Sequence, residues 1–306
     1  MGTRDENPGL RHVSRRPPLH NGGTDLAVLL PRAEVLRKRA ADERLIGAPV
    51  PRLKARYGLW LALVFLFTVG VAEAQAQPGM PSIIESIIKW TPLLLKGFVF
   101  NLAISFMAMA GGTIAGAFLG IWQISLLPPV RKGSRFVTQF FRNAPWLVLL
   151  FFCMFLLPFE FRIGEFAIPF PDWVKATFGL ALPVMANISE IVRGAIQSIP
   201  SGQWEAAESL AFSRRQTLWM IIIPQCVKRM LPPWMNLYAI LTMATVLASV
   251  VGVSEVMTLT QQALAAEDRA ELLVPFYSFI LLWFFLYCYP IARWTVRLER
   301  KYAVNI

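Results

Sequence analysis

Residues 205–216 read EAAESLAFSRRQ, a polar and strongly helix-forming segment that lies between two long apolar runs. Alanine, leucine and glutamate favour a helix in its first half, and Ser201 is in position to cap the start of that helix. Ser213 is followed three residues later by Gln216, which is the spacing of a capping box. The pattern therefore predicts two short helices, the second of which begins at Arg214.

The second helix meets Pro224, which is expected to limit or kink it because proline lacks an amide hydrogen and its ring clashes with the preceding turn. Residues 200–225, which we call the elbow, thus form a helix pair held between apolar segments. A DNA-reading helix-turn-helix needs a domain that holds it in a groove, and about twenty residues between membrane segments provide none. The elbow is interpreted as a rigid surface for a protein partner.

The composition is that of a membrane protein. Of the 306 residues, 56% are hydrophobic and only 16% are charged, whereas about 25% of the residues of an ordinary globular domain are charged. The mean hydropathy is +0.50. This much apolar surface cannot be buried in one soluble core, so we expect an all-α integral membrane protein with several spans.

The net charge of +11 raises the question of a nucleic acid partner. Residues 1–57 carry 12 Lys and Arg against 6 Asp and Glu, so 12 − 6 = +6 of the charge lies in this segment alone. The remaining basic residues flank the apolar segments instead of forming one basic face. The charge is therefore interpreted as a signal of membrane topology, and no nucleic acid partner is expected.

The sequence offers no catalytic or metal-binding constellation. Cys153, Cys226 and Cys288 are scattered, which indicates neither a disulfide framework nor a metal site. Both histidines, His12 and His20, lie in the polar N-terminal segment. No Gly-Lys dipeptide occurs, so a P-loop is absent from the sequence. We therefore expect no enzyme and no cofactor in this chain, and any ATP and Mg used must be bound by a partner ATPase.

The front of the chain leaves three interpretations open. Residues 1–57 predict a basic, disordered cytoplasmic tail, and residues 58–72 predict an additional N-terminal span, although a span usually needs about 20 residues. The following AEAQA (residues 72–76) resembles a signal-peptidase site, so a cleaved signal is the first alternative. A translation start at Met80 is the second. Residues 73–95 are interpreted as a periplasmic linker with a short helix.

Five further apolar segments predict a helical bundle, the membrane domain of residues 96–296. Their predicted limits are 98–121, 143–159, 174–192, 230–254 and 272–292. Basic residues gather in alternate loops, at 131–142, in the elbow with its exit at 228–229, and after residue 292. Because cytoplasmic loops carry the excess of Lys and Arg, the elbow and the C-terminal tail (297–306) are predicted to be cytoplasmic.

Four stretches accompany the elbow in order: GFVFNLAIS (97–105), FFRNAPWLV (140–148), EIVRGAIQSIP (190–200), and LPP with LASVVGV (231–233 and 247–253). Together they resemble the ABC-transporter permeases of the polar amino acid uptake group, which are binding-protein-dependent inner membrane components with a MetI-like transmembrane domain. The resemblance covers residues 97–297. It departs from the family at Ala211, where a glycine is usual, and at Asn143-Ala144, where Gly-Thr is usual, a change that bears on substrate or gating.

The resemblance implies a multi-pass permease subunit in a bacterial inner membrane, which moves polar amino acids or related small solutes by alternating access. The implied partners are ABC ATPase subunits, a second permease copy or paralogue, a periplasmic solute-binding protein and membrane lipid. The elbow residues implied to couple to the ATPase are Glu205, Ala206, Ala207, Glu208, Leu210, Ala211, Phe212 and Arg214. The alternative function is that of a stand-alone secondary transporter or channel.

Polar side chains within the spans are the candidates for a substrate pathway. They are Asn187, Ser189, Asn236, Thr242, Thr245 and Ser249. Hydroxyl groups in membrane helices also bond a neighbouring helix or their own backbone. Glu190 and Arg193, one turn apart, predict an ion pair with a gating or structural role. Gly112, Gly116 and Gly120 predict a face for close helix packing.

The first testable prediction concerns topology. Because the basic loops share one face, a reporter fused after Lys301 is expected to behave as cytoplasmic and one inserted at Asp268 as periplasmic. Alkaline phosphatase and fluorescent-protein fusions measure this directly. The opposite pattern would invert the orientation and remove the elbow from the cytoplasm.

Overall fold

The structure is a computed structural model that describes residues 56–75, 79–163 and 166–302. Most of the predicted N-terminal tail lies outside these residues. The helices are α3 (Arg56–Gln75), α4 (Ile83–Gln123), α5 (Pro128–Asn143), α6 (Trp146–Leu156), α7 (Asp172–Gln197), α8 (Ser201–Ser209), α9 (Arg214–Gln216), α10 (Ile223–Ala244), α11 (Val256–Glu267) and α12 (Leu273–Tyr302). A π-helix, η2 (Thr217–Ile222), precedes α10, and 3₁₀-helices η3 (Thr245–Val251) and η4 (Ala270–Leu272) flank α11.

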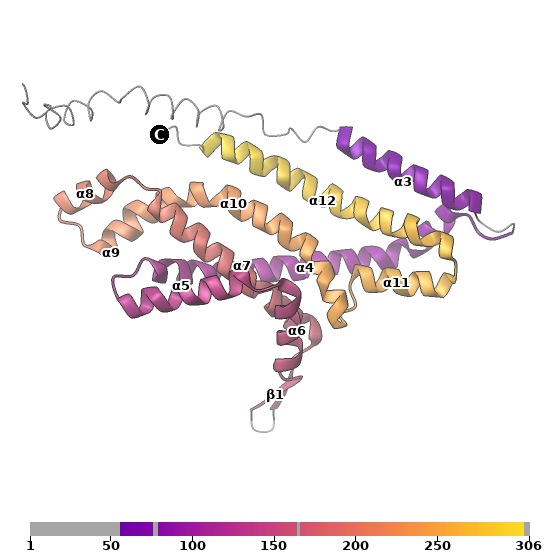
Figure 1. Cartoon of the computed structure of the whole chain (residues 1–306), viewed down its shortest axis with the longest axis horizontal. Helices are drawn as coiled ribbons and strands as arrows, with labels where there is room; N and C mark the ends of the chain where they lie inside the picture. Colours follow the sequence, from indigo (N-terminus) through magenta and orange to yellow (C-terminus); the bar gives the residue numbers. More distant parts are fainter. Residues whose placement is uncertain (1–55, 76–78, 164–165, 303–306) are drawn as a thin grey trace, which may run out of the picture. The chain divides into compact units, whose positions relative to one another are not determined.

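The fold is the helical bundle that the sequence predicts (Figure 1). Within the described residues, five helical segments are long and apolar enough to cross a membrane, or six if the bent pair α5 and α6 forms one span. One apolar cluster joins α4, α6, α7 and α10. A second joins α3, the first half of α4, α11 and α12. The additional N-terminal segment is therefore a helix that packs against the last one.

Helices α4 and α7 approach closely along the predicted glycine face. A methyl group on Gly112 would lie 2.5 Å from Val184, and one on Gly116 would lie 2.5 Å from the carbonyl oxygen of Met185. These distances are shorter than van der Waals contact, so no larger residue fits without a shift of one helix. Gly120 meets the backbone of Ser189 in the same way, at 2.7 Å. The expectation of a packing face is confirmed.

The segment predicted as a span at 143–159 is helical over a shorter range, and a sharp bend lies at its start. Helix α6 covers only Trp146–Leu156, and its axis is bent by 105° from that of α5. Pro145 is the cause, because proline disfavours a helical conformation at the preceding residue, and Ala144 is extended with φ −74° and ψ 136°. The predicted limits therefore extend beyond α6 at both ends, and α6 follows α5 as a sharply bent pair of helices.

Helix α4 begins earlier than the predicted span. Ser82 and Glu85 form a capping box that starts the helix at Ile83. The helix has 41 residues, so it is about 60 Å long, twice the roughly 30 Å of a hydrocarbon core. The segment expected as a linker with a short helix is therefore helical from residue 83 and continuous with the span.

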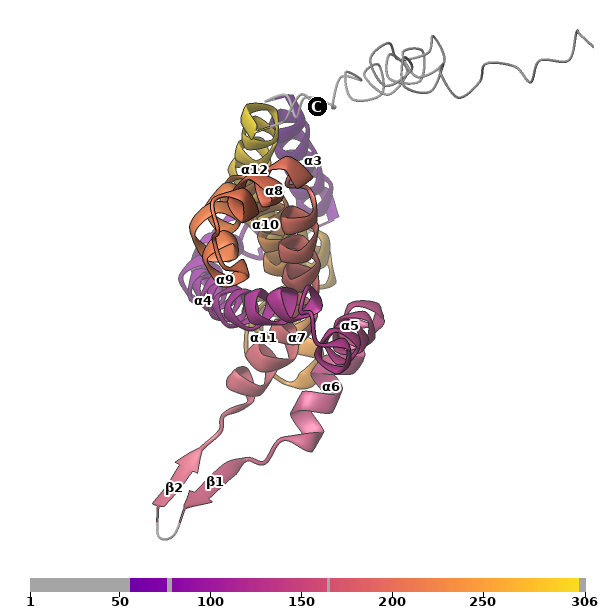
Figure 2. The ribbon, with the colours of Figure 1, turned by 90° about the vertical axis from the view of Figure 1, so that its left-hand side faces the viewer.

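A two-stranded antiparallel hairpin separates α6 from α7. Strand β1 (Glu160–Ile163) pairs with β2 (Phe166–Pro169) in the register Glu160 with Pro169, and the hairpin extends away from the helices (Figure 2). Lys175, in the first turn of α7, lies beside the base of the hairpin and is fully buried. Its ammonium group lies 3.6 Å from the centre of the Phe159 ring and 3.3 Å from Asp172. Both contacts compensate the burial of the charge, and the contact with Phe159 joins the base of the hairpin to α7.

The second prediction tests the α4–α7 contact. Gly116→Ala is expected to lower the stability of the purified protein by about 1–3 kcal/mol, because the added methyl group overpacks a backbone contact. Thermal unfolding in detergent measures the change. Gly111→Ala is the matched control, since a methyl group there has no atom within 4 Å. Equal melting temperatures of the two variants would contradict the close approach.

Candidate functional site

A cavity of about 560 Å³ lies between α7 and α10, with Arg142 from the end of α5 at its edge. Its walls mix apolar residues with two amides, one carboxylate and two guanidinium groups. The polar lining residues are Arg142, Asn187, Glu190, Ser198, Arg229 and Asn236. A cavity with a few convergent polar groups in an apolar wall is the usual form of a small-molecule site.

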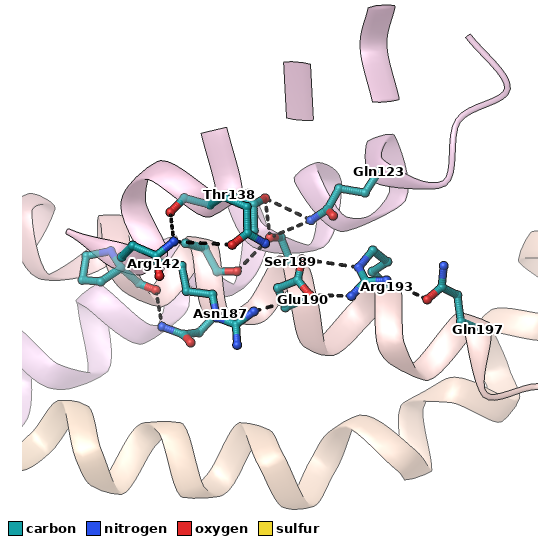
Figure 3. A network of polar contacts seen from close by, with 12 residues as sticks. Gln123, Thr138, Arg142, Asn187, Ser189, Glu190, Arg193 and Gln197 are labelled. Atoms are coloured by element: carbon teal, nitrogen blue, oxygen red, sulfur yellow. Dashed lines mark hydrogen bonds and ion pairs between the residues drawn. The ribbon is translucent and has the colours of Figure 1, made fainter. Parts of the chain in front are cut away.

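Glu190 is the centre of the charged lining. The Arg193 guanidinium donates to both of its carboxylate oxygens, at 2.6 and 3.3 Å, and Arg142 approaches one of them at 3.6 Å (Figure 3). Arg193 also donates to Gln197 at 2.7 Å. The predicted ion pair is therefore present, and its two-pronged geometry holds the carboxylate in one orientation.

Ser189 belongs to a buried polar contact and not to the cavity wall. The amide of Gln123 donates to the hydroxyl oxygens of Thr138 and Ser189, at 3.0 and 3.1 Å, and the two hydroxyls lie 2.8 Å apart. These three residues come from α4, α5 and α7 (Figure 3). Because a buried polar group must be paired, the contact fixes how the three helices meet.

The predicted pathway residues separate into two groups. Asn187 and Asn236 line the cavity from α7 and α10. The hydroxyl groups of Thr242, Thr245 and Ser249 instead donate to backbone carbonyls three or four residues earlier. None of these three lines the cavity, and their predicted common face is interrupted because α10 gives way to a 3₁₀-helix at Thr245.

Thr245 belongs to a second buried polar cluster. The amide of Asn101 donates to the Thr245 hydroxyl at 3.0 Å and to the Glu255 carboxylate at 2.8 Å. Glu255 also accepts from the amides of Met257 and Thr258 and so caps α11. Burial raises the pKa of the Glu255 carboxyl above its ordinary value, and these hydrogen bonds oppose the shift. The cluster anchors η3 and α11 to α4.

The elbow has the predicted two helices with a tight turn between them. The amide of Phe212 donates to the carbonyl of Ala207 at 3.1 Å, and that of Ala211 donates to Glu208 at 2.9 Å, which is a Schellman ending of α8. Ala211 has φ +58°, a left-handed conformation that costs a residue with a side chain about 1–2 kcal/mol. The glycine-type turn is therefore kept although alanine occupies it.

Two expectations about the ends of the elbow helices require correction. Pro200, not Ser201, is the N-cap of α8, and no side chain caps that end. The capping box of Ser213 and Gln216 is confirmed. Pro224 does not end the second helix, which continues into α10, but the α-helical hydrogen bonding is interrupted immediately before it by the π-helix η2.

The exposed face of the elbow differs in one position from the expectation. Glu205, Ala206 and Glu208 are exposed, and the Leu210 side chain is 71% exposed. Ala207, which was expected to face a partner, is only 1% exposed. Ala206, the preceding residue of α8, is exposed in its place. Phe212 is half-buried, and the Arg214 guanidinium lies 5.8 Å from the centre of the Trp204 ring.

Several site residues were not proposed as such from the sequence. Arg142 and Arg229 were interpreted only as topology signals, although both line the cavity. Gln123 and Asn101 are polar residues in a long apolar run, which is the signal that could have found the two buried clusters. Asn143, which was expected to bear on substrate or gating, is exposed and donates to the carbonyl of Gln139.

Comparison with protein families gives one model that matches residues 112–304, that of the binding-protein-dependent transport system inner membrane component. A probable amino-acid ABC transporter permease, YckA of Bacillus subtilis, is 36% identical over 212 residues, which are 69% of this chain and 90% of the relative. The glutamine transport system permease GlnP of Escherichia coli is 30% identical over 70% of this chain and 94% of its own length.

Solved structures agree with the fold. The crystal structure of an amino acid ABC transporter with histidines matches 71% of this chain and 97% of its own, with a TM-score of 0.60 and 23% identity. An inward-facing MetNI methionine ABC transporter matches 70% of this chain and 98% of its own, with a TM-score of 0.55 and 15% identity. At such identities the likeness is one of fold alone.

Proposed function

Because the chain belongs to the family of binding-protein-dependent transport system inner membrane components, we propose that it is the subunit through which an ATP-driven importer passes polar amino acids or related small solutes. The family makes the chain a multi-pass inner membrane permease and not an ATPase. The amino acid substrate is proposed from the names of the relatives. The cavity with two amides and charged groups of both signs supports it, since an amino acid is itself a small zwitterion.

The observation that carries the mechanism is the elbow. It is a compact unit with its own capping box and closed turn, and α8 with its turn exposes short, acidic and apolar residues. Glu205 and Glu208 can meet basic groups of a partner, Ala206 keeps the face thin, and Leu210 offers an apolar contact. Transport of this family requires an ATPase and a solute-binding protein. We assign the elbow as the ATPase contact, with ATP and Mg bound on that partner.

The remaining assignments follow from this one. The membrane domain is proposed to comprise residues 96–296, with the elbow and residues 297–306 on the cytoplasmic side and a second permease copy or paralogue beside it. Asn187 and Asn236 are proposed as substrate contacts, with Glu190 and Arg193 as the gate at the edge of the cavity. The hydroxyl groups at positions 242, 245 and 249 are assigned to helix packing.

The third prediction tests the elbow. Glu205→Lys reverses an exposed charge, and Ala206→Trp enlarges the outer face. Both are expected to leave the protein in the membrane and to weaken ATPase co-purification at least several-fold. Ala211→Gly is the control, because glycine adopts a positive φ without the cost that alanine pays and so stabilises the turn by up to about 1 kcal/mol. Wild-type binding and transport in both disruptive variants would show that the ATPase binds elsewhere.

The fourth prediction tests the cavity. Asn236→Ala removes an amide from the cavity wall and is expected to lower amino acid uptake by roughly tenfold, the effect of one unpaired polar group of the substrate. Uptake by proteoliposomes that contain the complete transporter measures this. Ser249→Ala is the matched control, because its hydroxyl donates to the carbonyl of Val246 and does not line the cavity. If Ser249→Ala lost more amino acid uptake than Asn236→Ala, the substrate pathway would instead follow the hydroxyl groups of Thr242, Thr245 and Ser249.

A further inference from the structure

The elbow connects the end of α7 to the start of α10, and we call these two helix ends its arms. One arginine joins the two arms. The Nη1 atom of Arg229, in the second turn of α10, donates to the carbonyl oxygen of Ser198 at 2.6 Å and to its hydroxyl oxygen at 2.8 Å. Ser198 is the C-cap of α7, and its hydroxyl donates in turn to the carbonyl of Ala195 at 2.7 Å. The elbow therefore leaves and returns to the bundle through a closed clasp, which we define as Arg229 and Ser198.

The clasp is a strong contact for its size. The carbonyl groups at the C-terminal end of a helix lack partners within the helix and carry the negative end of its dipole. A guanidinium group satisfies such a carbonyl with a charge-assisted hydrogen bond, which is roughly twice as strong as a neutral one. Arg229 is half-buried, and both hydrogen bonds of the clasp lie at the exposed surface. A longer contact of 3.4 Å between Gln203 and Gln225 joins the same two arms one step farther out.

The clasp also forms part of the cavity. Ser198 and Arg229 both line it, together with Glu190 and Asn236. On the other side, α8 begins at Ser201, three positions after Ser198. The same two side chains thus lie between the surface proposed to meet the ATPase and the cavity proposed to hold the substrate.

Helix α10 is weak immediately beyond the clasp. Pro232 and Pro233 both lie inside the helix, and Pro233 lines the cavity. Two prolines remove two backbone hydrogen bonds and provide a point at which the helix can bend. If the base of α10 were also free to move away from α7, a displacement of the elbow would be absorbed there and would not reach the cavity.

We propose that Arg229 is a positioning residue that transmits the movement of the elbow to the cavity by holding the ends of α7 and α10 together. The inference rests on the proposed function and extends it, because it assigns the coupling to a residue outside the ATPase contact. With the clasp closed, the two arms move as one body and the bend occurs at the proline pair. With the clasp open, the elbow still binds the ATPase but its motion is lost at the base.

The test compares Arg229→Ala and Arg229→Lys with Lys228→Ala in the reconstituted transporter. Lys228 is the adjacent exposed cation and controls for the loss of a positive charge. Arg229→Ala is expected to retain ATPase co-purification and ATP hydrolysis while the amino acid transported per ATP falls about tenfold, because both charge-assisted hydrogen bonds of the clasp are lost. Arg229→Lys, which keeps the charge without the planar fork, is expected to lie between Arg229→Ala and wild type.

Three results would overturn the proposal. They are a wild-type transport ratio in Arg229→Ala, an equal loss in Lys228→Ala, and loss of ATPase binding in Arg229→Ala. The last result would make the clasp a part of the elbow's own fold.

A second readout separates this proposal from the proposed function. Cys226 lies one turn before Arg229 and is fully buried. In chains whose other two cysteines are replaced by alanine, an open clasp is expected to increase the alkylation rate of Cys226 at least threefold in Arg229→Ala relative to Lys228→Ala. If the wild-type transporter takes up no amino acid, the proposed function fails. The alkylation rate of Cys226 then decides by itself whether the clasp holds the two arms together. Equal alkylation rates in Arg229→Ala and Lys228→Ala would reject the clasp.

Discussion

Helices α4 and α7 touch backbone to backbone, because a methyl group on Gly112, Gly116 or Gly120 would lie 2.5–2.7 Å from an atom of α7. In a membrane, where the lipid is as apolar as the side chains, such close packing is a principal source of helix association. The contact sets the position of α7, and α7 carries Asn187 and Glu190 into the cavity and ends at the elbow. The site is therefore placed by a seam of residues that have no side chain.

Buried polar clusters fix the two ends of this seam. Gln123 joins α4 to α5 and α7 at one end, and Asn101 joins α4 to η3 and α11 at the other. Each cluster pairs polar atoms that would be costly to leave unpaired in an apolar surrounding, although Gln123 Oε1 has no hydrogen-bond partner among the described residues. Packing alone would allow a helix to slide or rotate along its neighbour. The paired polar atoms select one register.

The elbow combines local rigidity with departures from regular geometry. Its turn holds Ala211 at φ +58°, and its second helix widens into the π-helix η2 before Pro224. Strained residues and π-helical turns persist only where surrounding contacts hold them. Here the capping box at Ser213 and the hydrogen bond into Ala207 provide those contacts. The elbow is thus a preformed body, and in our proposal the clasp at Arg229 transmits its movement to the cavity.

The sequence by itself determined the fold class, the helix pair of the elbow with its capping box, the glycine seam and the Glu190–Arg193 pair, because hydropathy, capping and helical spacing act over a few residues. Tertiary structure decided what depends on distant partners. Residue 207 is buried although residue 206 is exposed, and α10 gives way to a 3₁₀-helix at Thr245. The hydroxyl groups of Thr242 and Thr245 donate to carbonyl groups of their own helical segment. The cavity and the clasp join residues far apart in the chain, and no local pattern records which distant side chains will meet.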